Sequence, residues 1–348
     1  MNVQHDSLLA PYTSLHVGGP AKTLIELTDA DSLQDALSKA SAPIYVLGYG
    51  TNTLVSDKGV DGTVIINRGD AIKQLSPTQL KVTSGVAWDD LVKKTIEQGL
   101  YGLEFTSGIP GGVGAAIVGN IAAYGQSVSD CLLGATILDI TTGSITSWGK
   151  QAFEFSYRFS ALQKPKHKNC LIIDATFELS KEPTSQLEYD SALNIGQKLG
   201  LEPNSLADRR AIIMETREQS GSLLVDNATG PWTAGSFFKN PVVNEDQLDA
   251  IIKHEETNIS KDQLLRQNKI HGGSRVRVSA AHVLLAAGFK RGQTWGSVRF
   301  HPDHILKVEN TGRATAQEIY EVIQEIIKTV HDKLAIDLEP EVRFLGEF

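Results

Sequence analysis

The stretch VLGYGTNTLV, residues 46–55, decides which nucleotide-binding fold this chain can adopt. A Rossmann fold requires G-x-G-x-x-G at the start of a helix, but the third glycine position here is Thr53. Residues 54–57 (LVSD) also begin a helix poorly. What remains is a strand that ends in Gly48 and Gly50, whose backbone N–H groups could approach a pyrophosphate closely. The stretch excludes the Rossmann fingerprint and fits either an anion-binding loop or a tight structural turn.

A second glycine-rich stretch, SGIPGGVGAAIVGNIAAYG, covers residues 107–125 and contains six glycines in nineteen residues. The glycines and Pro110 make it too irregular for a plain helix. Small side chains and bare backbone suit a large flat ligand, and long irregular segments inside domains are often functional. A glycine-rich crossover packed under a sheet explains this stretch equally well on its own.

The composition is that of a soluble globular protein with two or three domains. The chain has 348 residues, of which 41% are hydrophobic and 21% charged. A formal net charge of -8 argues against broad nucleic-acid binding but leaves room for a local basic pocket. Cys131 and Cys170 form no CxxC pair or zinc-type cluster, so we expect both to be packed thiols in a reducing compartment.

Targeting and metal signals are also missing from the sequence. The amino-terminal residues MNVQHDSLLAPYTS lack the features of a secretion signal, and no apolar run approaches the roughly 18 residues that span a bilayer. We therefore expect a cytoplasmic protein without membrane insertion. Four histidines show no ligand spacing with acidic residues, so no metal site is expected; they are His16, His271, His301 and His304.

Hydrophobic periodicity predicts an α+β fold. Predicted strands cover residues 21–27, 43–47, 63–67 and 80–84, several strands lie within 135–177, and predicted helices cover 31–39, 88–97 and 245–266. The clearest helix follows the capping-box pair Thr315 and Glu318 and has one apolar face between Ile319 and Val330. AIDLEPEVRF then resumes strand character and could join an earlier sheet.

Eight motifs in consistent order resemble those of the UDP-N-acetylenolpyruvoylglucosamine reductases, flavoenzymes of peptidoglycan precursor synthesis. They cover nearly the whole chain: LHVGGPA (15–21), LGYGTNTLV (47–55), GLEFTSGIPGGVG (102–114), GNIAAYG (119–125), SYRFS (156–160), AGSFFKNPVV (234–243), VSAAHVLLAAGFKRG (278–292) and LEPEVRF (338–344). GSFFKNP and LEPEVRF are the most specific of them.

The resemblance implies the fold and the domains. The FAD-binding unit would be of the vanillyl-alcohol-oxidase/PCMH type, with two α+β subdomains and no Rossmann motif, followed by an α+β substrate-binding domain. We expect subdomain 1 at residues 1–70, joined by a terminal strand at 335–348, subdomain 2 at 71–225 and the substrate-binding domain at 226–334. The SYRFS segment is similar to the form of the family with an extra loop, whose substrate-contacting tyrosine would be Tyr189.

The resemblance also implies the reaction. NADPH would reduce FAD, and reduced flavin N5 would deliver hydride to C3 of UDP-N-acetylglucosamine enolpyruvate, giving UDP-N-acetylmuramate. The developing charge at C2 needs stabilisation, which Arg158 would provide as a permanent bidentate cation and Glu341 as a second polarising group. Glu339 has a similar spacing to Glu341 on an ideal strand, and only the motif favours Glu341.

Ser236, in WTAGSFFKNP, is the implied proton donor to C2, because a basic carbon can take a proton even from a hydroxyl. Lys239 or a water chain could restore that proton. Without the family context, Ser236 is most simply a small residue between bulky ones. A serine nucleophile is a competing idea, but the chain has no G-x-S-x-G elbow.

The remaining contacts also follow from the resemblance. FAD would be contacted by Gly48, Gly50, Thr51, Asn52, Ile109, Pro110, Gly111, Gly112 and Val113. The sugar nucleotide would be contacted by Tyr189, Lys239 and Asn240.

Two positions depart from the family pattern. Many relatives carry R-x-x-K before the serine, whereas here Arg217 is followed by Ser220. Gly119 replaces a common glutamine before Asn120. The first change leaves the nucleotide contacts of this region open.

Two other function classes remain. One is an oxidase on the same flavin fold, which would consume oxygen with an alcohol substrate. The other is a non-catalytic flavin- or nucleotide-binding protein, which would not require Arg158, Ser236 and Glu341 together.

Overall fold

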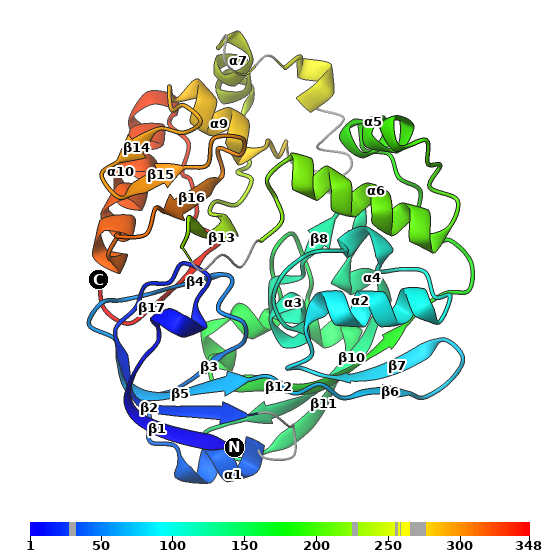
Figure 1. The fold of residues 1–348 in the computed structure, drawn as a ribbon, viewed down its shortest axis with the longest axis vertical. Coiled ribbons are helices and arrows are strands. Elements are labelled where there is room, and N and C mark those ends of the chain that lie inside the picture. Colours follow the sequence, from blue (N-terminus) through cyan, green and yellow to red (C-terminus); the bar gives the residue numbers. More distant parts are fainter. Residues whose placement is uncertain (28–32, 225–228, 255–256, 258, 265–275) are drawn as a thin grey trace. The chain divides into compact units, whose positions relative to one another are not determined.

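The computed structural model describes residues 1–27, 33–224, 229–254, 257, 259–264 and 276–348, which form two compact units (Figure 1). The amino-terminal unit contains Met1–Ser7, Ala21–Tyr49 and Asp61–Gln219. The carboxy-terminal unit contains Leu8–Pro20, Gly50–Val60 and Ser220–Phe348. The three-part division into 1–70, 71–225 and 226–334 stays a prediction, because compactness alone separates only these two units.

A four-stranded sheet begins the amino-terminal unit. Its strand order is β1-β2-β5-β3, with β1 Asn2–Leu8, β2 Pro20–Leu27, β5 Val60–Asn67 and β3 Ile44–Leu47. Helix α1, Leu33–Lys39, buries Leu33 and Ala36 in a cluster with Ile25 and Ile65 of the sheet. The strands predicted at 21–27, 43–47 and 63–67 are therefore confirmed, whereas the start of the helix predicted at 31–39 lies outside the described residues.

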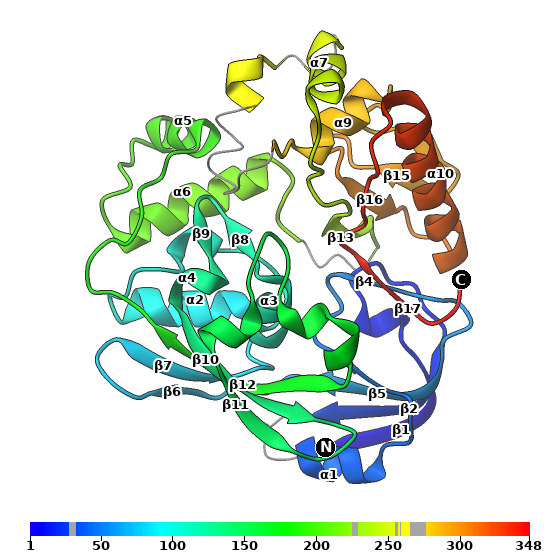
Figure 2. The same cartoon turned by 180° about the vertical axis from the view of Figure 1, so that it is seen from behind.

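A five-stranded antiparallel sheet follows in the same unit. Its order is β11-β10-β12-β7-β6, with β11 Ile145–Gly149, β10 Leu132–Asp139, β12 Cys170–Glu178, β7 Gln79–Thr83 and β6 Ile72–Gln74. Three helices lie on one side of this sheet (Figures 1 and 2): α2 Trp88–Glu97, α3 Val113–Gly119 and α4 Val128–Cys131. Trp88 and Ile117 pack with Phe177 in the core between them, so the glycine-rich stretch does contain one short helix.

Two further helices, α5 Asp190–Leu199 and α6 Leu206–Gln219, were not predicted. They pack on each other and on the 3₁₀ turn Glu104–Thr106 through Ala192, Ile212 and Phe105. Short elements complete the unit: β8 Ala122–Ala123, β9 Gln126–Ser127 and the 3₁₀ turns Lys150–Phe153, Ala161–Gln163 and Pro165–His167.

The carboxy-terminal unit has a four-stranded antiparallel sheet of order β13-β16-β15-β14. The strands are β13 Trp232–Ser236, β16 Lys307–Asn310, β15 Val298–Phe300 and β14 Thr294–Trp295. The helices are α7 Glu245–Lys253, α9 Ala280–Ala286 and α10 Ala316–Leu334, and a 3₁₀ turn covers Ala10–Tyr12. A separate parallel pair joins β17, Arg343–Leu345, to β4, Thr53–Val55, so the terminal strand does join an earlier segment of the chain.

Helix α10 shows the predicted capping box. Thr315 Oγ1 accepts from the Glu318 N–H at 3.1 Å, and Glu318 accepts from the Thr315 N–H at 2.8 Å. Asp57 adds a cap that the sequence did not suggest, because its two carboxylate oxygens accept from the N–H groups of Ala316 and Gln317, each at 2.9 Å. A carboxylate at a helix amino terminus also interacts favourably with the helix dipole. Among the described residues, no helix is both long enough and apolar enough to cross a membrane.

Replacing Asp57 by alanine should destabilise the first turn of α10, because two backbone N–H groups lose their acceptor. We expect a loss of about 1 kcal/mol in the free energy of unfolding, the usual cost of removing a helix cap. Urea denaturation with hydrogen exchange of the first turn of α10 measures it. Asp61→Ala is the control, since the Asp61 side chain forms an exposed ion pair with Lys22. Equal stability of the two variants would contradict the capping role.

Candidate active site

The first glycine loop connects β3 to β4, and its two glycines have different surroundings. A Cβ built at Gly50 would lie 2.0 Å from the carbonyl oxygen of Tyr12, and Gly50 has φ +60°. The fold itself therefore requires glycine at position 50. A Cβ built at Gly48 meets no protein atom within 4 Å, so this position is open on the protein side.

Tyr49 links the two glycine loops within the amino-terminal unit. Its hydroxyl donates to the carbonyl of Gly85 at 3.2 Å, and the guanidinium of Arg68 lies 3.9 Å from the centre of its ring. Burial raises the pKa of Tyr49, so the phenol remains a donor. A Cβ at Gly112 would lie 3.4 Å from the same ring, which places the second loop next to the first.

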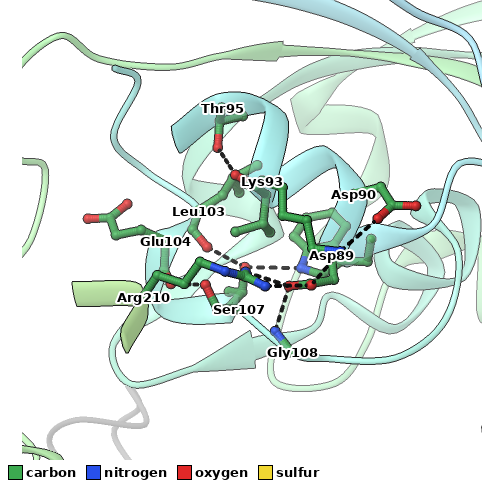
Figure 3. A network of polar contacts seen from close by, with 12 residues as sticks. Asp89, Asp90, Lys93, Thr95, Leu103, Glu104, Ser107, Gly108 and Arg210 are labelled. Carbon is green, nitrogen blue, oxygen red and sulfur yellow. Dashed lines mark hydrogen bonds and ion pairs between the residues drawn. The ribbon is translucent and has the colours of Figure 1, made fainter. Parts of the chain in front are cut away.

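The second loop is fixed at several points. The Gly111 carbonyl accepts from the N–H of Trp88 at 2.8 Å, and the Val113 N–H donates to the Val86 carbonyl at 2.9 Å. At the start of the loop, the Gly108 N–H donates to Asp89 Oδ1 at 2.7 Å. Figure 3 shows that Asp89 in turn meets Arg210, from α6. The start of α2 thus holds the loop, through the backbone N–H of Trp88 and the side chain of Asp89.

Arg210 binds both carboxylate oxygens of Asp89 at 2.7 Å, which is the bidentate geometry of a strong ion pair. Burial alone would raise the pKa of Asp89, but the bonds from Arg210 and the Gly108 N–H outweigh it and hold that pKa below its usual value. Beside it, Arg209 donates to the fully buried Glu104 at 2.8 Å. Sequence reasoning missed these four residues because their partners are more than a hundred positions apart.

Arg158 lies at the tip of a tight turn. Ser156 and Phe159 exchange two backbone hydrogen bonds of 3.1 Å, and Arg158 between them has φ +51°, which is uncommon for a residue with a side chain. Two side chains hold the turn: Asn120 donates to the Ser156 carbonyl at 3.0 Å, and Gln163 donates to the Arg158 carbonyl at 3.1 Å. The GNIAAYG motif therefore supports the SYRFS motif through Asn120.

A cluster of tyrosines and arginines accompanies Arg158 in the same unit. Tyr189, the residue before α5, meets Tyr124 edge-to-face with ring centres 5.3 Å apart. Burial, with smaller contributions from Tyr124 and Tyr157, raises the pKa of Tyr189 to about 12. Burial also lowers the pKa of Arg217, and the nearby Arg158 adds to this effect. The structure thus brings Tyr189 and Arg158 into one region and adds Tyr124 and Arg217 to it.

Ser236 ends β13, directly after a bulge. The register of β13 with β16 shifts between Thr233 and Ser236, and Gly235 within the bulge has φ +77°. Bulges of this kind redirect side chains beside active sites. A Cβ at Gly235 would meet no atom within 4 Å, so there is open space next to Ser236.

Glu341 is brought close to Ser236 by backbone pairing in the carboxy-terminal unit. The N–H of Glu341 donates to the carbonyl of Phe237 at 2.8 Å, and Phe238 bridges Pro340. Asn52 Nδ2 donates to the Glu341 carbonyl at 3.1 Å. Three residues predicted from separate motifs therefore meet here: Ser236, Glu341 and Asn52.

Lys239 and Asn240 have partners within the protein. Lys239 Nζ binds Glu339 Oε1 at 2.5 Å, in a pair whose carboxylate is largely exposed. This pairing distinguishes the two glutamates of LEPEVRF, because Glu339 meets Lys239 while Glu341 is tied beside Ser236. The Asn240 side chain accepts from the Ala280 N–H at 3.0 Å and so supports the start of α9. Its predicted contact with a nucleotide stays a prediction.

Two further predictions concern metals and cysteines. Within the described ranges, no group of three or more His, Cys, Asp or Glu side chains is placed to hold a metal ion, and His271 lies outside those ranges. Both cysteines are free thiols; Cys131 is buried and Cys170 half-buried.

Comparison with known proteins first defines the class. Residues 21–149 match the family model described as "FAD binding domain", which includes both glycine loops. The chain is therefore an FAD-binding flavoprotein. The loops suit the cofactor, because among the described residues no protein acceptor is recorded for the N–H groups of Gly50 and Thr51 in the carboxy-terminal unit, nor for those of Gly111 and Gly112 in the amino-terminal unit. Backbone N–H groups without a protein acceptor can bind phosphate oxygens.

The family follows from the rest of the chain. Residues 226–345 match the model "UDP-N-acetylenolpyruvoylglucosamine reductase, C-terminal domain". The UDP-N-acetylenolpyruvoylglucosamine reductase of Saccharopolyspora erythraea is 34% identical, with 96% of this chain and 93% of that protein covered. That of Streptomyces coelicolor is 31% identical, with 98% and 90% covered. The chain belongs to the UDP-N-acetylenolpyruvoylglucosamine reductase family.

A solved structure supports the fold. The reductase of Thermus caldophilus superposes with a TM-score of 0.67 at 23% identity and covers 99% of this chain and 100% of that one. The predicted α+β fold class with an FAD-binding part is confirmed, as is FAD as cofactor. The protein is an FAD-containing oxidoreductase of peptidoglycan synthesis, as expected. The roles of individual residues stay predictions.

Proposed function

We propose that this protein uses NADPH to reduce UDP-N-acetylglucosamine enolpyruvate to UDP-N-acetylmuramate. The observation that carries the proposal is the pairing of residues 339–341 with 237–239, which sets Glu341 beside Ser236. Family membership over nearly the whole chain supports the same reaction. When bound, FAD would take hydride from NADPH and supply it to C3 of the enolpyruvyl group.

The glycine loops would hold the cofactor. Gly48, Gly50, Thr51 and Asn52 belong to the first loop, and the second contributes Ile109, Pro110, Gly111, Gly112 and Val113. The backbone N–H groups at positions 50, 51, 111 and 112 would donate to the pyrophosphate oxygens. The open side of Gly48 would let the ligand lie directly on the backbone.

Arg158 and Glu341 would stabilise the charge that develops near C2. The guanidinium of Arg158 would bind the substrate carboxylate, onto which this charge spreads. The turn that carries Arg158 is fixed by Asn120 and Gln163, so little reorganisation is needed when the charge appears. Glu341 would polarise the enolpyruvyl group from the carboxy-terminal unit.

Ser236 would protonate C2. Its Oγ–H bond breaks as the C2–H bond forms, and the bulge before it leaves open space at Gly235 for the reacting carbon. Tyr189, Lys239 and Asn240 would contact the sugar nucleotide. For Lys239, this requires that it exchange its ion pair with Glu339 for a substrate group.

The direct test is an assay of the purified yellow holoenzyme. NADPH oxidation should accelerate strongly when UDP-N-acetylglucosamine enolpyruvate is added under anaerobic conditions. Substrate-independent turnover that needs oxygen would instead indicate an oxidase. A bound flavin with neither activity would indicate a binding protein, and either result would refute the proposed reaction.

Replacing Ser236 by alanine should separate the two half-reactions. Flavin reduction by NADPH should stay within about twofold of wild type, whereas reoxidation by the enolpyruvyl substrate should slow about 100-fold or more, the usual contribution of a general acid. Stopped-flow absorbance of the flavin measures both rates. Ser297→Ala, in the β14–β15 hairpin, is the matched control. An equal fall in both half-reactions would make Ser236 a structural residue.

Replacing Gly48 by alanine should weaken FAD binding without disturbing the protein. The added methyl meets no protein atom within 4 Å, so any effect arises from the ligand. We expect FAD release from the holoenzyme to become at least about tenfold faster, equivalent to roughly 1.4 kcal/mol, with an unchanged melting temperature of the flavin-free protein. Flavin fluorescence on dilution reports the release. The control is Gly149→Ala, another position with room for a methyl, which should release FAD at the wild-type rate. An unchanged rate of FAD release from Gly48→Ala would mean that the cofactor binds elsewhere.

A further inference from the structure

The strands β15 and β16 carry a second set of charged residues that the sequence analysis did not identify. Successive side chains of a strand point to opposite faces of its sheet. Val298, Phe300 and Val308 belong to the apolar core that α10 also enters. The alternate positions Arg299, Lys307 and Glu309 therefore share the other face. This sheet has one apolar face and one charged face.

Two of the three charged side chains on this face are buried. Lys307 is 6% exposed and Glu309 is 2% exposed. Buried charges are costly unless they are paired or used. Glu309 has two ion-pair partners: Arg299 Nε lies 2.7 Å from its Oε2, and His301 Nε2 lies 3.8 Å from its Oε1. Lys307 is the buried cation of this face.

Lys307 lies opposite Ser236. The register of β13 and β16 after the bulge pairs the two residues directly, so their side chains project from the same face with Cβ atoms about 4.5–5.5 Å apart. Lys307 Nζ donates to the carbonyl of Gly221 at 2.6 Å, which keeps the ammonium inside the carboxy-terminal unit.

We propose that Lys307 is a positioning residue for Ser236 that stabilises the serine alkoxide and returns its proton. The inference rests on the proposed reaction, in which Ser236 is the acid. Electrostatic attraction between an ammonium and an alkoxide is strong at short range away from water. A lysine in this position lowers the cost of removing the hydroxyl proton.

The proton balance is complete with groups on this face and solvent. Ser236 gives its proton to C2 and becomes an alkoxide. The alkoxide then takes a proton from the Lys307 ammonium, and the neutral amine takes one from water. The net reaction consumes one proton from solvent together with the hydride.

Lys239, which the sequence suggested for this task, is less well placed. It lies three residues after Ser236, beyond two buried phenylalanines, and its ammonium is bound to Glu339 at 2.5 Å. Its backbone is also paired with residue 339 rather than with β16. Lys307 pairs with Ser236 across the sheet, and Lys239 does not.

The test replaces Lys307 by methionine, which has similar length and no charge, and by arginine, which keeps the charge. Stopped-flow absorbance follows both half-reactions of the holoenzyme. Lys307→Met should slow reoxidation by UDP-N-acetylglucosamine enolpyruvate about 100-fold while flavin reduction by NADPH stays within about twofold. Lys307→Arg should recover part of the lost rate, because the alkoxide is again stabilised, but not all of it, since arginine does not give up its proton.

The matched control is Lys333→Met, because Lys333 also donates to a backbone carbonyl, that of Ala287. It should behave as wild type. Normal reoxidation in Lys307→Met would overturn the inference, and so would an equal fall in both half-reactions. If Lys307→Met does not fold, full wild-type reoxidation in Lys307→Arg would overturn it. Failure of the proposed reaction is distinguishable, since the wild-type flavin would then not be reoxidised by the substrate at all.

Discussion

The pairing of residues 339–341 with 237–239 is the constraint on which the carboxy-terminal unit depends. It joins the end of the chain to the residues after β13, with Glu341 donating to Phe237 and Lys239 donating to Glu339. Two residues further on, the chain forms β17 and pairs with β4, while the Arg343 N–H donates to the Asn52 carbonyl. This terminal segment thereby holds the residues after β13, strand β4 and Asn52 in place. The relative placement of Ser236, Glu341 and Asn52 is a consequence of this closure.

The same unit separates packing from chemistry by the two faces of one sheet. The apolar face excludes water with α9 and α10, and its burial stabilises the unit. The opposite face carries charges whose desolvation is unfavourable, and the Arg299–Glu309 ion pair offsets part of that cost. Ser236 and Lys307 pair directly across β13 and β16, on the face that apolar packing does not use.

Local patterns were predictable from the sequence, and long-range partners were not. The capping box of α10 was correct because Thr315 and Glu318 are three residues apart, within one helical turn. Asp57, which caps the same helix from 259 positions away, left no local signal. The Asp89–Arg210 pair spans 121 positions and was missed for the same reason. Motif resemblance supplied the family and the residues, but not the groups that hold them in place.

The two glycines of LGYG show a second limit of the sequence. Both fit an anion-binding loop, and the sequence alone does not distinguish their roles. In the structure, Gly50 is fixed by Tyr12 and Gly48 is not, so one glycine serves the fold and the other is available to a ligand. Glu339 and Glu341 differ in the same way, since Lys239 pairs with the first.

Arg158 shows how the fold prepares a functional group in advance. A left-handed conformation at a residue with a side chain costs on the order of 1–3 kcal/mol and persists only where surrounding contacts impose it. The bonds from Asn120 and Gln163 impose it here, and Asn120 itself is left-handed at φ +42°. Asn120 lies within the second glycine-rich stretch, and Arg158 follows it in the chain. The conformational cost is met when the protein folds, so that binding an anion does not also have to order the turn that carries the guanidinium.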